Sequence, residues 1–478
     1  MGGATREPGS STANALRPLE PSSRLYGTAT FTWMMFSMNV CVPLFVLGTV
    51  GLQLGLSPAE VVLGAILGNL ATTVVLVLNG IPGVKLGIPY PVQLRASWGY
   101  RGASIPVVLR GIVGAGWYGI EAYSASLAVL MLLLYALGYG GGDPAAMASA
   151  AFRYVVVVLV PYVVVATLAV MRGLRAIARA VDLSGPLLLA YFVWLTVYLS
   201  GQSPTAAAVG GAGVLSRNFA LYLAIQTNFW ATVGLNAADL ARGLYADRRG
   251  LRALVVGPLV GIVLTSAVAS LLGYYLTLYT GLASPTPQEI VLYRAPGEVA
   301  VALGLVFAAL APFTTDITAN IPALMNIFTS VLGVSWRAAA VAAGVVGFLV
   351  APWWAVERGP DLINYVAAFT ANYGLILGPI AGVMIADYYI VKRGYELRKL
   401  YTNGPEGYWY RGGYNPAAVA TFLLSVAVIY GVSYAIGDVN VVTVGGVGVP
   451  FPTTLSWYIG VAVAAAIYTV LAKLLRTG

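Results

Sequence analysis

The sequence contains no histidine and only one cysteine, Cys41. Without histidine the chain lacks the commonest general base and transition-metal ligand, and one cysteine cannot build a disulfide framework or a thiolate metal cluster. These absences argue against the usual hydrolytic enzymes. Charge is scarce as well, because 9% of the 478 residues are charged and 59% are hydrophobic. Such a composition indicates a membrane protein and not a water-soluble globule.

Long hydrophobic runs fill most of the sequence, and a membrane-spanning helix needs about 20 such residues. The polar segment 1–24 shows no signal-peptide pattern and is expected to be a cytoplasmic tail. We therefore expect an all-α membrane protein with twelve transmembrane helices. The twelve segments lie at about 27–51, 57–80, 105–137, 151–171, 181–200, 217–241, 251–281, 299–328, 336–356, 361–391, 415–437 and 453–473.

The distribution of basic residues predicts the orientation in the membrane. If both termini lie on one side, most of the 26 Lys and Arg residues lie on that side too. Cytoplasmic loops carry the excess of Lys and Arg, so both termini are predicted to be cytoplasmic in the plasma membrane. The net charge of +9 then needs no nucleic-acid partner. The basic residues expected on the outer side are Arg153, Arg217, Arg294 and Arg358.

Two of the predicted spans are interrupted at similar depth. The first contains SMNVCVP at 37–43, where Pro43 disfavours helical geometry and frees backbone carbonyls. The sixth contains QTNFWATVGLN at 226–236, with Gly234 among amide and hydroxyl side chains. Paired interruptions in corresponding positions of two halves indicate an inverted-repeat transporter with its site at the midplane. A simple proline kink is the alternative.

The eighth span contains the polar stretch APFTTDITAN at 311–320. Thr314 and Thr315 present adjacent hydroxyls, and a hard cation such as sodium prefers neutral oxygens of this kind together with carbonyls. Alternatively, each threonine bonds to the carbonyl one turn earlier in its own helix. Asp316 and Asn320 share a helix face because they are four residues apart. So many polar groups within one span predict a binding site.

Glu121 lies in GWYGIEAYSAS at 116–126, with uncharged residues on both sides. Trp117 precedes it by four residues, so both side chains point to one face. An ionised carboxylate only accepts hydrogen bonds, which predicts a substrate with paired N–H donors, such as an aminated purine or a cytosine-like ring, ahead of a hydantoin. The alternatives are that Glu121 pairs within the protein or serves as a proton site.

Several motifs resemble, in order and spacing, those of the nucleobase:cation symporter-1 family over about residues 25–470. The resemblance implies a LeuT-like five-plus-five inverted repeat, with repeats at 25–200 and 201–400 and two further helices in 401–478. It also implies transport of nucleobases, hydantoins, allantoin or related vitamins with sodium or protons. The motifs are GIPYPVQLRASWGYRGASIPVVLRGIVGAGWYGIEAY, FWATVGLNAADLARG, TTDITAN, IADYYIVKRGYELRKLY and YWYRGGYNPAA.

The resemblance also implies a set of substrate-binding residues. Trp117 and Trp230 match the aromatic positions that sandwich a planar heterocycle, and indole faces can stack on any flat ring. Glu121 matches a position that is commonly glutamine, and Asn320 matches an asparagine that bonds the ring edge. Cys41 stands at a substrate-facing position often held by an amide.

For the coupling ion, the resemblance implies a sodium site with the hydroxyls of Thr314 and Thr315 as ligands. The backbone carbonyls implied as further ligands are those of Ala311, Ser37 and Val40. Asp316 departs from a position that is often asparagine or serine. Three roles are open for Asp316: it adds charge near the cation, it titrates as a proton site, as Glu121 could, or it is a paired structural acid.

The sequence thus predicts a secondary active transporter that imports a planar nitrogen heterocycle with sodium or a proton by alternating access, without enzymatic activity or a cofactor. Its partners are the heterocycle, the coupling ion and the bilayer. An amino-acid/cation symporter of the same fold is the nearest alternative, followed by a channel. Structural roles are predicted for other charged residues: Arg110 packs or extends toward the inner surface, and Asp239 pairs with Arg242 on one helix face.

Overall fold

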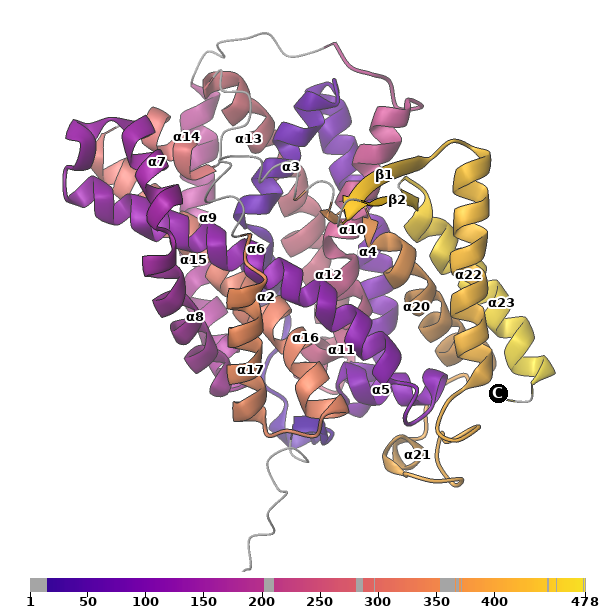
Figure 1. Cartoon of the computed structure of the whole chain (residues 1–478). Coiled ribbons are helices and arrows are strands. Elements are labelled where there is room, and N and C mark those ends of the chain that lie inside the picture. The colour runs from indigo at the N-terminus through magenta and orange to yellow at the C-terminus, as the bar shows by residue number, and fades with distance from the viewer. Residues whose placement is uncertain are drawn as a thin grey trace, which may run out of the picture.

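The structure is a computed structural model in which nearly every element is a helix (Figure 1). It describes residues 15–201, 210–280, 287–295, 297–352, 366, 369–370, 372–444, 447–452, 454–475 and 477. Residues 1–14 of the predicted tail, Arg358 and most of the first part of the predicted tenth span lie outside the described residues.

The elements follow the order of the predicted spans. Those up to residue 200 are η1 (Pro21–Ser23), α2 (Thr28–Asn39), α3 (Val42–Gln53), α4 (Pro58–Leu86), α5 (Tyr90–Trp98), α6 (Ser104–Ala136), η2 (Tyr139–Gly142), α7 (Pro144–Tyr154), α8 (Val156–Met171) and α9 (Leu174–Ser200). Those from 217 to 349 are α10 (Arg217–Leu235), α11 (Ala237–Ala241), α12 (Arg248–Pro258), η3 (Leu259–Leu264), α13 (Thr265–Thr280), α14 (Pro287–Arg294), α15 (Glu298–Thr315), η4 (Asp316–Asn320), α16 (Ile321–Asn326), η5 (Ile327–Val331) and α17 (Trp336–Leu349). The last are α20 (Gly374–Ala386), η6 (Asp387–Val391), α21 (Leu397–Tyr401), α22 (Pro416–Ala435), β1 (Val439–Val444), β2 (Val447–Pro452) and α23 (Ser456–Leu474).

These helices confirm the all-α membrane fold. Within the described part of the chain, 8 helical segments are long and apolar enough to cross a membrane, and two bent pairs raise this number to 10. The bent pairs are α2 with α3, at 55°, and α7 with α8, at 63°. Two further helices, the polar α10 and the short apolar α17, lie at the predicted sixth and ninth spans. Each predicted span therefore contains a helix.

The ends of α4 show how local sequence sets a helix boundary. Ser57 accepts a hydrogen bond from the backbone N–H of Glu60, and the Glu60 carboxylate accepts one from the backbone of Ser57. This reciprocal capping satisfies N–H groups that have no partner within the helix. At the other end Gly87 adopts a φ of 74°, a left-handed conformation that glycine takes at little steric cost. The second span is thereby delimited on both sides.

A short antiparallel hairpin, which the sequence analysis did not anticipate, joins α22 to α23. Strand β1 pairs with β2 in a register that runs from Val439 opposite Pro452 to Val444 opposite Val447. Both strands are rich in valine, a residue favoured in strands. The hairpin lies beside the upper ends of α20 and α22 in Figure 1 and leaves the helical class of the fold unchanged.

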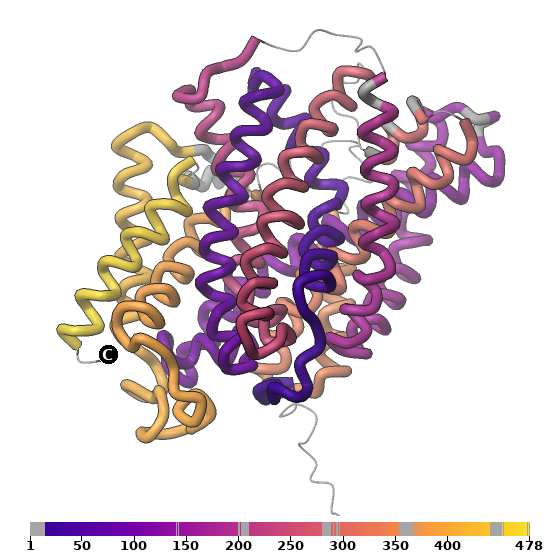
Figure 2. The backbone as a smooth tube through the Cα atoms, turned by 180° about the vertical axis from the view of Figure 1, so that it is seen from behind, coloured from indigo at the N-terminus to yellow at the C-terminus, as the bar shows by residue number. Residues whose placement is uncertain are grey.

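The two ends of the described chain lie at the same end of the helical bundle, together with α5 and α21 (Figures 1 and 2). The backbone N–H of Leu19 donates to the carbonyl of Gly87, at 3.0 Å, just after α4. The ammonium of Lys392 donates to the carbonyl of Thr477, at 3.4 Å. A chain with both ends on one side of the bundle crosses the membrane an even number of times.

Helices α3 and α13 pack with their backbones in close approach. A Cβ added to Gly48 would lie 2.0 Å from the carbonyl oxygen of Ser270, and one added to Gly273 would lie 2.0 Å from that of Phe45. Small residues allow this proximity between membrane helices, where tight packing contributes much of the stability. Helix α3, the second half of the broken first span, is therefore fixed against α13.

Candidate substrate and cation sites

The first span is broken where the sequence predicts it. Helix α2 ends at Asn39 and α3 begins at Val42, with Val40 and Cys41 between them outside helical geometry. Cys41 is extended, with φ −116° and ψ 160°, and Pro43 follows in the first turn of α3. The carbonyls at the end of α2 consequently lack partners in a continuing helix.

Hydroxyls of the eighth span meet these freed carbonyls. The Thr314 hydroxyl donates to the carbonyls of Ser37 at 2.9 Å and Ala311 at 2.8 Å. The Thr315 hydroxyl donates to the carbonyls of Met38 at 2.8 Å and Ala311 at 3.1 Å. All these oxygens are neutral and buried, and they come from two spans far apart in sequence. Such a set suits a small hard cation.

Most of the predicted cation ligands are therefore brought together. Ala311, Ser37 and the two threonines form one oxygen cluster, but Thr315 hydrogen-bonds to Met38 and not to Val40. Sequence reasoning did not point to Met38, because only backbone position brings its carbonyl to Thr315 and no side-chain signal marks it. Its place beside Ser37 in the interrupted turn was the available hint.

The sixth span is broken as well, and a tryptophan joins the two breaks. Helix α10 ends at Leu235, and Asn236 separates it from α11 with φ −97° and ψ 28°. Within α10, the indole N–H of Trp230 donates to the side-chain oxygen of Asn39, at 2.6 Å. Because Asn39 is the last residue of α2, this bond connects the two interrupted spans.

The predicted tryptophan pair encloses a third aromatic ring. The Phe229 ring lies edge-on to Trp117, with centroids 5.0 Å apart, and edge-on to Trp230, at 5.2 Å. Both indoles are buried, and the Trp117 N–H donates to the hydroxyl of Tyr373 at 3.3 Å. Phe229 therefore contacts both indoles proposed to stack on the heterocycle. Phe229 directly precedes Trp230, and this adjacency was its only signal in the sequence.

The four polar candidates near the break form one buried cluster. The Cys41 thiol lies within hydrogen-bonding reach of the Glu121 carboxyl group. Asp316 accepts hydrogen bonds from the Tyr162 hydroxyl at 2.8 Å and from the Asn320 amide at 2.9 Å. The carboxyl groups of Glu121 and Asp316 are close enough to interact electrostatically. Asp316 is thus a hydrogen-bonded acid within the protein, next in sequence to the threonine cluster.

A buried arginine below this cluster contradicts the interpretation of Arg110 as a residue that extends toward the inner surface. Arg110 is 1% exposed. Its guanidinium donates to the carbonyl of Thr232 at 2.9 Å, the side-chain oxygen of Asn236 at 3.1 Å and the carbonyl of Ala319 at 3.4 Å. Helix α6 is thereby connected to the break after α10 and to the π-helical turn η4, whose wider spacing leaves carbonyls available.

Asp239 extends this network toward the end of the bundle at which the two chain ends lie. Its carboxylate accepts hydrogen bonds from the Tyr90 backbone at 2.8 Å and from the amides of Asn236 at 2.9 Å and Asn326 at 2.7 Å. The predicted partner Arg242 instead donates to the carbonyl of Ala15, at 2.9 Å.

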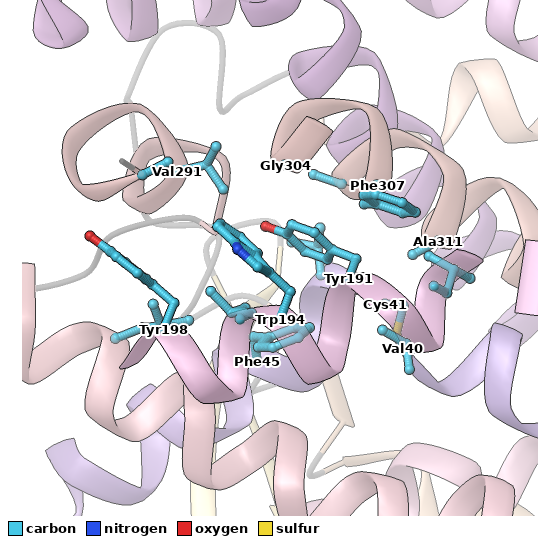
Figure 3. Close-up of a pocket in the computed structure, with 16 residues that line it drawn as sticks. Val40, Cys41, Phe45, Tyr191, Trp194, Tyr198, Val291, Gly304, Phe307 and Ala311 are labelled. Atoms are coloured by element: carbon cyan, nitrogen blue, oxygen red, sulfur yellow. The ribbon is translucent and has the colours of Figure 1, made fainter. Parts of the chain in front are cut away.

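A mostly apolar pocket begins at the first break (Figure 3). Cys41 and Ala311 line one end of it, and Tyr191 stacks on Phe307 along its wall with ring centroids 4.6 Å apart. The aromatic residues of the lining are Phe45, Tyr191, Trp194, Tyr198 and Phe307. Open space therefore adjoins the polar cluster on the side of Cys41.

Residues 18–472 match the family described as permeases for cytosine/purines, uracil, thiamine and allantoin. The chain belongs to this family. The permease is 28% identical to the purine-uracil permease NCS1 of Arabidopsis thaliana, over 87% of this chain and 70% of that one. It is also 28% identical to the allantoin permease of Bacillus subtilis, over 96% of this chain and 92% of that one.

The permease also shares its fold with a solved transporter. The structure of Mhp1, a nucleobase-cation-symport-1 family transporter in a closed conformation with bromovinylhydantoin bound, matches with a TM-score of 0.77 at 19% identity. The match covers 98% of this chain and 96% of that one. The fold and family expected from the sequence motifs are therefore confirmed, and the protein is a multi-pass membrane permease.

Proposed function

We propose that this permease imports a planar nitrogen heterocycle together with sodium by alternating access. The substrate is a nucleobase, such as a purine, cytosine or uracil, or a hydantoin- or allantoin-like ring. The observation that carries the proposal is the meeting of two broken spans at one buried site, with neutral oxygens on one side and aromatic and polar side chains on the other. The ring leaves the protein chemically unchanged, and the permease is not an enzyme.

The proposed substrate site consists of Trp117, Trp230, Glu121, Asn320 and Cys41. It is supported by the burial of all five side chains and by the Trp230–Asn39 bond, which ties the site to the first break. Planar rings gain stacking energy on indole faces. The breaks in the first and sixth spans also support two repeats at 25–200 and 201–400, followed by two helices in 401–478.

Sodium is the proposed coupling ion because the threonine cluster supplies only neutral oxygens. The proposed ligands are the hydroxyls of Thr314 and Thr315 and the carbonyls of Ala311, Ser37 and Met38, with Val40 close by in the break. Proton coupling is the second candidate, favoured by the two buried carboxyl groups of Glu121 and Asp316.

The proposed location is the plasma membrane with both termini in the cytoplasm. Support comes from the two chain ends, which lie at the same end of the helical bundle. Basic residues around α5, η6 and α21 lie at that end of the bundle too, including Arg95, Lys392 and Arg398. Positive charge accumulates on the cytoplasmic side of membrane proteins.

The cation is tested on purified protein by ligand-induced thermal stabilisation, since a ligand that binds only the folded state raises apparent stability. The double variant Thr314→Ala/Thr315→Ala is expected to lose sodium-dependent stabilisation. Thr329→Ala is a matched control, because Thr329 is a buried threonine whose hydroxyl donates to the carbonyl of Met325, at 3.0 Å, within its own span. Full sodium dependence in the double variant would place the site elsewhere. Uptake into liposomes driven by a pH gradient without sodium would assign coupling to protons.

A further inference from the structure

The Asn320 amide is held on one side by an acid. Its Nδ2 donates to Oδ1 of Asp316 at 2.9 Å, and the other carboxylate oxygen of Asp316 accepts the Tyr162 hydroxyl at 2.8 Å. Asp316 is fully buried, and its two donors come from different elements, η4 and α8. The carboxylate is therefore fixed from two directions.

This contact determines which end of the amide is free. In the structure both oxygens of Asp316 act as acceptors, and the NH2 end of the Asn320 amide faces one of them. Among the described residues, the oxygen Oδ1 of Asn320 accepts no hydrogen bond. Asn320 thus offers an acceptor.

A second free acceptor lies nearby on α6, which packs against η4. The Glu121 oxygen Oε2 is buried and has no hydrogen-bond partner among the described residues. The Glu121 carboxyl group interacts electrostatically with Asp316, the acid that holds Asn320. A buried acceptor without a donor is unfavourable. An N–H group of a bound ring would satisfy the Glu121 oxygen, and a second N–H group would pair with the Asn320 oxygen.

We propose that Asp316 is a positioning residue for substrate selection: it turns the Asn320 oxygen toward the ring, so that the site selects heterocycles with N–H donors facing both Asn320 and Glu121. The inference rests on the proposed function and narrows its substrate class. A ring with a carbonyl at either position places two acceptors against each other and is disfavoured, because a site built for one hydrogen-bond pattern rejects the ring that lacks it.

The test uses guanine and xanthine as probes, because guanine carries adjacent ring N–H and amine donors where xanthine has a carbonyl in place of the amine. Binding to purified protein is measured by thermal stabilisation and by competition for uptake. The wild type is expected to prefer guanine. In Asp316→Asn the new amide can donate to the Asn320 oxygen, which turns Asn320 over and presents its NH2 group. The ratio of the two dissociation constants is expected to shift toward xanthine by at least tenfold.

Two further variants separate positioning from general damage. Tyr162→Phe removes the other donor to Asp316 and is expected to keep the guanine preference. Asn320→Ala removes the selecting acceptor and is expected to reduce the preference, which provides a test even if Asp316→Asn does not fold. An unchanged ranking in Asp316→Asn or Asn320→Ala, or a wild-type preference for xanthine, overturns the inference and leaves the proposed function standing. A wild type that binds none of guanine, xanthine, uracil and hydantoin overturns both.

Discussion

Replacing Arg110 by methionine should open the inner side of the permease. Methionine keeps much of the side-chain length but cannot donate to the carbonyls of Thr232 and Ala319 or to Asn236. These three acceptors lie in the last turn of α10, at the break after it and on η4, so the bonds hold α6 against all three. Their loss weakens the arrangement seen in the structure relative to an open arrangement without these contacts.

The magnitude follows from the two shorter bonds, at 2.9 and 3.1 Å, which share the single Nε–H of Arg110. A hydrogen bond from a charged donor contributes about 1.5–3 kcal/mol, and part of this is offset because the buried charge no longer has to be desolvated. We expect a net loss of about 1–2 kcal/mol for the arrangement seen in the structure. At about 1.4 kcal/mol per factor of ten, the opening equilibrium rises by about 5- to 30-fold.

The assay is the rate at which maleimide labels a cysteine introduced at Thr329, which is buried and lines the cavity below Asp239. Cys41→Ala provides a background without the native thiol. Arg101→Met is the matched control, because Arg101 is an exposed arginine that lies over the Trp409 ring, at 5.0 Å, at the same end of the bundle. Equal labelling with and without Arg110→Met in folded protein, or the same increase in the control, would refute the reasoning.

The remaining predictions concern the substrate. Trp117→Ala and Trp230→Ala should each weaken heterocycle binding by about 1–3 kcal/mol in calorimetry, and leucine should restore little because it lacks a flat face; unchanged affinity in both alanine variants would remove the tryptophan sandwich. Glu121→Gln should lower affinity for the native substrate at least tenfold, about 1.4 kcal/mol, and move preference toward rings with one donor and one acceptor. Equal affinity and ranking in that variant would show that Glu121 does not contact the ring edge.

The helices and the two breaks could be predicted from the sequence because their causes are local. Hydrophobic length defines the spans, and Pro43 lies directly after the interruption that it promotes. The candidate cation site could also be predicted from the sequence, since Thr314 and Thr315 carry adjacent hydroxyls in an apolar span. Which backbone carbonyls approach the threonines could not be predicted, because every residue carries the same carbonyl group. Only the folded break brings the carbonyl of Met38, and not that of Val40, to Thr315.

Of the two interpretations of Arg110, packing within the protein agrees with its burial, whereas extension toward the inner surface is wrong, for a related reason. Near the start of a span, an arginine resembles one whose charge extends to the membrane surface. Two of its three actual acceptors are backbone carbonyls, of Thr232 and Ala319, on elements more than a hundred residues away in the chain. Backbone partners of this kind cannot be predicted from the pattern of side chains in the sequence. The position of Phe229 between the two indoles likewise depends on how α10 turns against α6.

The glycine contacts between α3 and α13 restrict how the first span can move. Because Gly48 and Gly273 place the two backbones against each other, α3 cannot tilt alone without colliding with α13. A change of angle at Val40 and Cys41 must then be made by α2, or by α3 and α13 turning as a single rigid pair. The carbonyls of Ser37 and Met38 belong to the last turn of α2, so in the first case the hinge carries two of the five oxygens of the cluster away from the threonines. Pivoting of α2 and dispersal of that cluster are then the same event.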